Sequence, residues 1–210
     1  MKRKKEMKLE MASFGASVME TRAIEIGYKF NVSIYGVLSS GNVKGTCIKE
    51  YGENMGEKII TGLTVSENNL IITINNVLFK ANTIAKIFER IAQKNINIDM
   101  ISQTAPINGY INISFTANKD DLEAINDVIA KIREEILGIE VSIELNISKV
   151  SLVGIGMMNQ SGVTARVFKI LADNDIEFKQ VTTSEISISF AIDVKDKHKA
   201  AHVLAKELNL

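Results

Sequence analysis

The sequence predicts an α+β protein built from two copies of one small unit, and two observations support this. First, an offset of 80 residues aligns the chain with itself, so that residues 84–88 match 164–168 and residues 95–98 match 175–178. Second, both copies show β-branched runs and apolar residues at helical spacing in the same order. A period of this length exceeds that of solenoid repeats and therefore indicates duplication of a whole small domain.

The elements of the first copy follow from local patterns. The run at residues 70–74 is β-branched, and apolar residues at helical spacing follow it. Asn108-Gly109 predicts a turn between two alternating strands, and Gly138 predicts the end of the second helix. The predicted strand, helix, two strands, helix and strand lie near residues 70–74, 84–91, 96–100, 110–115, 120–137 and 139–145.

The second copy repeats this order from Val150 but reaches Leu210 one strand short. An unassigned strand at residues 59–65 precedes the first copy. Because a missing strand would leave unpaired backbone groups, we expect this strand to complete the second sheet. The predicted fold class is therefore two ferredoxin-like βαββαβ units, with the first inserted into the second.

These elements predict the domain organisation. The first unit is expected at residues 67–146, and the second at residues 59–66 together with 147–210. Residues 1–58 contain a predicted helix at 6–30 and short strands, which are too small for a core of their own. They are predicted to be an N-terminal helix/strand appendage or the tail of a larger domain.

Composition excludes several functions. Lys plus Arg equals Asp plus Glu at 25 each, which argues against a dedicated nucleic-acid binder. No apolar run has the length of a membrane span, and no secretory signal follows the basic start. The single Cys47 excludes an intramolecular disulfide and fits a reducing cytoplasm. We expect a cytoplasmic protein without nucleic-acid or membrane partners.

Residues suited to catalysis or metal binding do not form a recognisable set. The close pair Gly154 and Gly156 is better explained by a strand end that another backbone approaches than by a phosphate loop. His198 and His202 are spaced i, i+4 on a predicted helix but lack a third ligand. We therefore predict no catalytic residue, no metal site and no cofactor in this chain.

The first helix of each copy predicts a binding site. Free N–H groups and the positive end of the helix dipole, placed next to exposed strand edges, suit an α-carboxylate. Ordinary turn chemistry is the alternative for the polar residues there. The candidate effector-binding residues are Lys80, Ala81, Asn82, Asn97, Ile98 and Gln103 in the first copy, and Asn159, Gly162, Val163, Gln180 and Ser184 in the second.

Several stretches resemble the regulatory ACT domains of aspartokinases. Gly154-Ile155-Gly156-Met157 belongs to a stretch similar to the C-terminal ACT domain, and Ile98-Asp99-Met100-Ile101 to one similar to the first. The stretches that carry the resemblance are 149–157, 162–168 and 183–188 for the C-terminal domain, 95–101 with Gln103 and Phe115 for the first, 60–63 for a linker strand, and 10–16 with 45–46 for the end of the kinase domain.

The resemblance implies a function. Aspartokinases phosphorylate aspartate with ATP on the route to lysine, threonine and methionine, and their ACT pairs bind lysine or threonine, usually in a homodimer. A chain without the family's catalytic opening motif is expected to be inactive alone. It would be a regulatory subunit working with a catalytic kinase subunit, or a fragment of a longer kinase, with ATP needed only by the full enzyme.

One departure from the family bears on the effector site. Phe79-Lys80-Ala81-Asn82 stands where the first ACT domain usually has Asp-Lys-Pro-Gly, so the acid that would meet an effector's ammonium group is replaced. Three hypotheses remain: an amino-acid-binding regulatory module, an enzyme with kinase activity of its own, and a dimerisation module that has lost its ligand.

Overall fold

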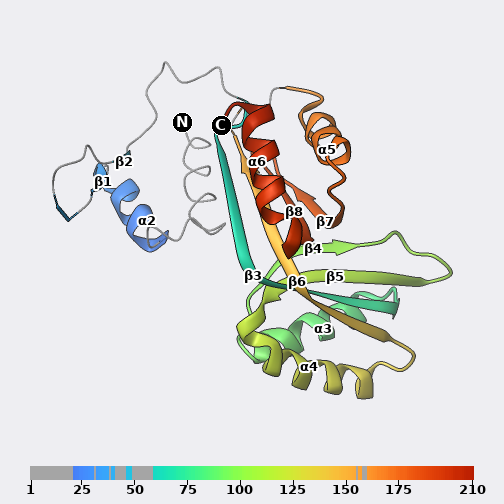
Figure 1. The fold of residues 1–210 in the computed structure, drawn as a ribbon. Helices are drawn as coiled ribbons and strands as arrows, with labels where there is room; N and C mark the ends of the chain where they lie inside the picture. The colour runs from blue at the N-terminus through green and yellow to red at the C-terminus, as the bar shows by residue number, and fades with distance from the viewer. Residues whose placement is uncertain are drawn as a thin grey trace.

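The computed structural model describes residues 21–30, 32–37, 39–40, 46–48, 59–154, 156–157 and 160–210 (Figure 1). The helices are α2 (Thr21–Lys29), α3 (Ala81–Gln93), α4 (Leu122–Glu135), α5 (Val163–Asp173) and α6 (Lys197–Leu208). The strands are β1 (Ile34–Gly36), β2 (Thr46–Ile48), β3 (Gly62–Leu78), β4 (Ile98–Gln103), β5 (Tyr110–Asn118), β6 (Glu140–Val153), β7 (Phe178–Thr183) and β8 (Ser187–Asp193).

Six strands form one antiparallel sheet in the order β4-β5-β3-β6-β8-β7. The long strands β3 and β6 run through both halves of it. Residues 62–66 of β3 pair with 149–153 of β6, whereas residues 71–75 pair with 140–144. The early part of β3 thus completes the half that contains β7 and β8, which confirms that the first unit is inserted into the second.

The prediction of separate strands on either side of residue 67 was wrong, because β3 is continuous over 17 residues. Two register shifts, between Ser66 and Asn69 and between Asn69 and Ile71, let it pass from one unit to the other. The Asn69 side chain donates to the Ser66 carbonyl at 2.9 Å and stabilises this irregular stretch. Below, unit 1 means the later part of β3, α3, β4, β5, α4 and the early part of β6; unit 2 is the remainder of the sheet with α5 and α6.

Each unit packs two helices on one face of its half of the sheet (Figure 1). In unit 1, Ile87 and Ile91 of α3 lie against Leu70, Ile72 and Ile74 of β3. The corresponding core of unit 2 joins α5 and α6 to β6 and β8, and its fully buried members include Val167, Leu171, Leu204, Leu152 and Phe190. The helical spacing of the apolar residues in the sequence therefore identified the buried faces correctly.

The predicted turns are also confirmed. Asn108 and Gly109 both have positive φ, 52° and 84°, as a two-residue hairpin turn between Ile107 and Tyr110 requires. Gly138 has φ of 83° just after α4, a conformation that other residues adopt at a cost.

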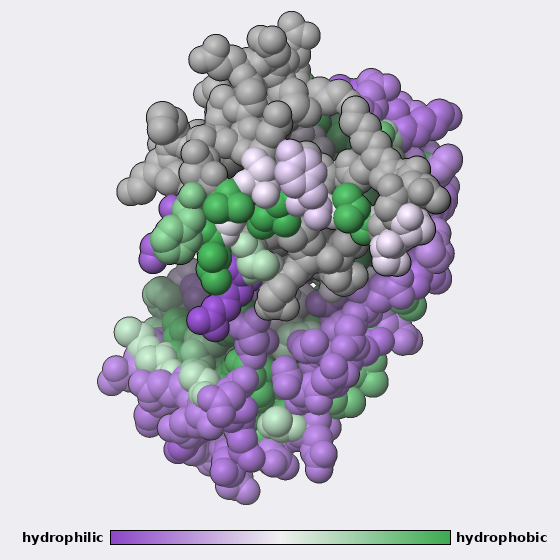
Figure 2. Space-filling view, turned by 90° about the vertical axis from the view of Figure 1, so that its left-hand side faces the viewer, coloured by the Kyte–Doolittle hydropathy of each residue, from purple (hydrophilic) through white to green (hydrophobic). Residues whose placement is uncertain are grey.

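The appendage contributes α2 and a two-stranded sheet of β1 and β2. Of the predicted helix at residues 6–30, only the part from residue 21 lies within the described residues, and it is helical to Lys29. Apolar side chains are exposed here, including Phe30, Val32 and Val37, and Figure 2 shows hydrophobic residues gathered on this side of the molecule. Among the described residues, no helix is long and apolar enough to cross a membrane.

Candidate functional site

The binding site predicted from the sequence lies at the starts of α3 and α5, and both helix starts lack a side-chain cap. Lys80 precedes α3 in an extended conformation, and Gly162 precedes α5 with a left-handed φ of 85°. Neither residue bonds a first-turn N–H group through its side chain. The Thr83 N–H donates to the Lys80 carbonyl at 2.9 Å, but no side chain of the preceding residue caps either helix start, which carries the positive end of the helix dipole.

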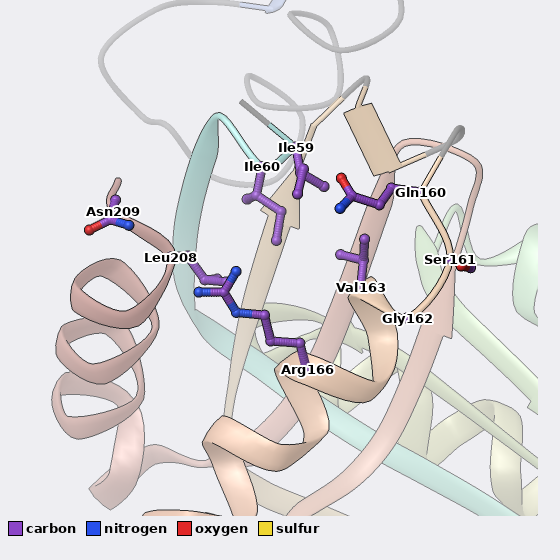
Figure 3. A pocket seen from close by; sticks show the side chains of 9 residues that line it. All are labelled: Ile59, Ile60, Gln160, Ser161, Gly162, Val163, Arg166, Leu208 and Asn209. Carbon is purple, nitrogen blue, oxygen red and sulfur yellow. The ribbon is translucent and has the colours of Figure 1, made fainter. Parts of the chain in front are cut away.

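A pocket of about 490 Å³ opens at the start of α5 (Figure 3). Two of the predicted residues, Gly162 and Val163, line it. The remaining lining residues come from the segment before β3, from the loop before α5, from α5 itself and from the end of α6: Ile59, Ile60, Gln160, Ser161, Arg166, Leu208 and Asn209. The walls are thus partly apolar, with polar groups at the helix ends.

Arg166 gives the pocket its positive charge. It lies one turn into α5, and its Nη2 donates to the carbonyl of Glu207 at 2.6 Å. This bond ties the start of α5 to the last turn of α6, whose carbonyls carry the negative end of that helix dipole. Figure 3 shows the Arg166 side chain reaching toward Leu208. The pocket therefore has a positive helix start on one side and a negative helix end on the other.

Close backbone packing builds this end of unit 2. The Thr61 N–H donates to the Val153 carbonyl, and the Gly154 N–H donates to the Ile186 carbonyl, both at 2.8 Å. A Cβ on Gly154 would lie 2.0 Å from the Ile59 carbonyl oxygen. The interpretation of Gly154 as a strand end that another backbone approaches is therefore confirmed.

The structure places Ser184 at this same end, in the turn between β7 and β8. Its Oγ lies 2.8 Å from Ser187 Oγ and accepts a hydrogen bond from the Ile186 N–H. Ser184 therefore stabilises the turn and does not line the pocket. Asn159 lies outside the described residues.

Gln180 does not lie with Gly162 as the sequence suggested. It is buried, and its amide donates to the Met100 carbonyl and, at 3.1 Å, to Ser102 Oγ, both in unit 1. A register shift between Phe178 and Gln180 changes which residues of β7 face the helices, and this shift was not visible in the sequence.

In unit 1 the predicted residues are spread over two ends of the sheet. Lys80, Ala81 and Asn82 are exposed at the start of α3, while Asn97 and Ile98 follow its C-terminal end. A 13-residue helix is about 20 Å long, so these two groups are not adjacent within the unit. Gln103 pairs with Ile113, nearer the end at which α3 begins.

The start of α3 is surrounded by exposed apolar side chains. Phe79 is 48% exposed, and its N–H donates to the Gly109 carbonyl at 2.8 Å. Leu78 pairs with Tyr110 on β5, and both are exposed, as is Ile107 beside them. The two helix starts thus differ in character, because exposed apolar side chains surround the start of α3 and a pocket opens at the start of α5.

Sequence reasoning missed Ile59, Ile60, Arg166, Leu208 and Asn209 as pocket residues. Arg166 could have been found, since it lies four residues after Gly162 and hence on the same side of α5. Within the described residues, no group of three or more His, Cys, Asp or Glu side chains could hold a metal ion. His198 and His202 are exposed on α6.

This architecture is that of proteins built from paired ferredoxin-like units, and comparison with known proteins identifies the family. The family model of the ACT domain matches residues 75–131 and 150–208, which together make up more than half of the chain. The chain belongs to the ACT domain family and is the regulatory region of an aspartokinase.

Individual relatives agree with this assignment. An aspartokinase of Geobacillus stearothermophilus is 34% identical over 202 residues, which cover 96% of this chain and 49% of that protein. The ligand-free regulatory subunit of aspartate kinase from Thermus thermophilus is 27% identical with a TM-score of 0.67, and the match covers 71% of this chain and 98% of that subunit. E. coli aspartokinase III in complex with lysine and aspartate (T-state) shares the fold, with a TM-score of 0.73 at 19% identity over 94% of this chain and 43% of that one. The chain spans about half the length of the curated relatives that it matches.

Proposed function

We propose that this chain is the amino-acid-binding regulatory part of an aspartate kinase, with lysine or threonine as its effector. The observation that carries the proposal is the pocket of about 490 Å³ at the start of α5, which is lined by the start of one helix and the end of another. An α-carboxylate suits the uncapped start of α5 and the Arg166 guanidinium. An ammonium group suits the negative end of the α6 dipole, beyond the Glu207 carbonyl that Arg166 already bonds. Ile59, Ile60, Val163 and Leu208 would contact the aliphatic part.

The family relationship supports this choice of ligand. One structural relative is described in complex with lysine, and another as a regulatory subunit. We place the tail of an amino-acid-kinase domain at residues 1–58, the first ACT unit at 67–146, and the second at 59–66 with 147–210. The full kinase would phosphorylate L-aspartate with ATP, and the ACT units would form a homodimer and regulate a catalytic kinase portion.

Thermal denaturation with lysine, threonine or methionine tests the proposal. A ligand at 100 times its Kd stabilises a protein by about 2.7 kcal/mol, so the effector should raise the melting temperature by several degrees. Arg166→Met should reduce this shift because it removes the charge that faces the carboxylate. Lys169→Met is the matched control, since Lys169 is exposed one turn later and pairs with Asp173.

A dimerisation module without a ligand is the second candidate function. The exposed group of Leu78, Phe79, Ile107 and Tyr110 favours it, because it occupies the helix start at which the first ACT domain would hold an effector. If none of the three amino acids shifts the melting temperature while sedimentation shows a dimer, this second function replaces the first. If the effector raises the melting temperature of Arg166→Met as much as that of the unmodified chain, the effector does not bind in the α5 pocket.

A further inference from the structure

The two units meet through the sheet faces that carry no helices, and these faces differ from the helix-covered ones. Ile71, Met100, Ile147 and Ala191 form a small apolar cluster there, joining β3 and β4 of unit 1 to β6 and β8 of unit 2. Around it the strands present hydroxyl groups, among them Ser102, Ser114, Thr116, Ser151 and Ser189. The continuous strands β3 and β6 join the units along one line, and because the apolar cluster holds only four residues, polar contacts add most of the attachment between the two facing sheet surfaces.

One side chain makes several of those contacts. Gln180 on β7 is only 6% exposed. Its Nε2 donates to the Met100 carbonyl, to Ser102 Oγ at 3.1 Å and to the Ser114 carbonyl at 3.3 Å. These acceptors belong to β4 and β5, so a single amide of unit 2 reaches two neighbouring strands of unit 1. A change in the relative position of the units would break these bonds together.

Matching irregularities in the two edge strands aim these groups at each other. The β4–β5 register shifts between Asp99 and Ser102, and the β7–β8 register shifts between Phe178 and Gln180. Met100 has a positive φ of 39°, which is uncommon for a residue with a side chain. The offset of 80 residues makes Met100 and Gln180 equivalent positions in the two copies. Each bulge therefore turns the equivalent residue of its unit toward the interface.

Two ion pairs flank this contact, and in both of them the lysine belongs to unit 2 and the carboxylate to unit 1. Lys149, buried on the unit 2 part of β6, pairs with Asp99 on β4 of unit 1. Lys179 on β7 of unit 2 pairs with Glu144 on the unit 1 part of β6. Each pair links the edge strand of one unit to the part of β6 that lies in the other unit. They add attraction between the units, and Gln180 adds several directional hydrogen bonds in the buried part of this contact.

We propose that Gln180 is a positioning residue that fixes the orientation of the two ACT units relative to each other. The amide oxygen of Gln180 has no partner among the described residues, and an unsatisfied buried acceptor opposes stability. A side chain selected only for stability at this position would be apolar, as Met100 is in the other copy. The contact is therefore suited to specifying one arrangement, and it is independent of which effector the chain binds.

The experiment compares Gln180→Met, which keeps the length of the side chain and removes its hydrogen bonds, with Gln103→Met on the exposed end of β4. Spin labels at Glu123 on α4 and Lys199 on α6, in a Cys47→Ser background, report the distance between the units by pulsed electron resonance. We expect a single narrow distribution for the parent and for Gln103→Met, and a distribution about twofold broader for Gln180→Met.

The spread of distances separates positioning from simple stabilisation. If Gln180 only stabilised the fold, its replacement would lower the melting temperature without broadening the distance distribution below the transition. An unchanged distribution in folded Gln180→Met therefore overturns the proposal. Ser102→Ala, which removes one acceptor of the same amide, provides a milder variant if Gln180→Met does not fold, and no broadening there would count equally against it. Because no effector is added, the result does not depend on the proposed function.

Discussion

Unit 1 and unit 2 share one order of elements, yet they are held together differently. Unit 1 has one aromatic contact in its core, between Phe88 and Phe115 at 5.9 Å. In unit 2, Phe168, Phe178 and Phe190 all contact one another, with ring centroids 5.3–5.7 Å apart. Unit 2 also takes a strand from before unit 1, whereas unit 1 is continuous in the chain. A duplicated fold can thus replace local connectivity with denser core contacts.

The largest effect should come from the central phenylalanine of each unit. Phe115→Ala and Phe190→Ala remove buried rings from β5 and β8, and each should lower the free energy of unfolding by about 3–5 kcal/mol. Phe190→Ala should cost about 0.5–1.5 kcal/mol more, since Phe190 contacts two rings and Phe115 contacts one. Urea unfolding followed by circular dichroism measures both. Equal costs would show that the aromatic cluster adds nothing to the stability of unit 2.

A smaller effect should follow from crowding the imported strand. Gly154→Ala brings a Cβ against the Ile59 carbonyl, and the overpacking should cost about 1–3 kcal/mol. The corresponding position of unit 1, at the offset of 80 residues, is Ile74, which is buried without such a clash. Hydrogen exchange should therefore accelerate at residues 62–66 and 149–153, with residues 71–75 as the internal control. Uniform acceleration along β3 would mean that the two halves of the strand open together.

Local patterns predicted the elements, and long-range contacts accounted for most of what they missed. Alternation and helical spacing identified the helices, the hairpin turn and the strand that completes unit 2. They could not show that β3 continues through the polar residues 67–69, because Asn68 is held there by Asn118 and Asp120, some fifty residues away. Likewise, a bulge in β7 decides on which face of the sheet the Gln180 side chain lies, because a one-residue shift exchanges the two faces of a strand. The pocket is lined by both Ile59 and Leu208, which only the folding of unit 2 around its completed sheet brings together.

The smallest effect concerns the more exposed of the two ion pairs between the units. The hydrogen bond with Glu144 raises the pKa of Lys179 above its usual value. Since the folded-state pKa exceeds the unfolded one, the pair contributes stability below the ordinary lysine pKa of about 10.4 and loses it as pH rises through the folded value. Both side chains are 40–45% exposed, so Glu144→Gln should cost under about 1 kcal/mol at pH 7.

The difference between Glu144→Gln and the parent chain should therefore shrink in urea unfolding at pH above that of lysine titration. Glu140→Gln, at an exposed position on the same strand, is the matched control and should show no such pH dependence. Because both variants contain the other lysines, the contribution of those lysines to the pH dependence of stability cancels when the variants are compared at the same pH. A difference that stays constant across the alkaline range would assign the effect to β6 itself. The polar contacts that join the facing surfaces of the two units would then be chiefly the buried ones of Gln180 and Lys149.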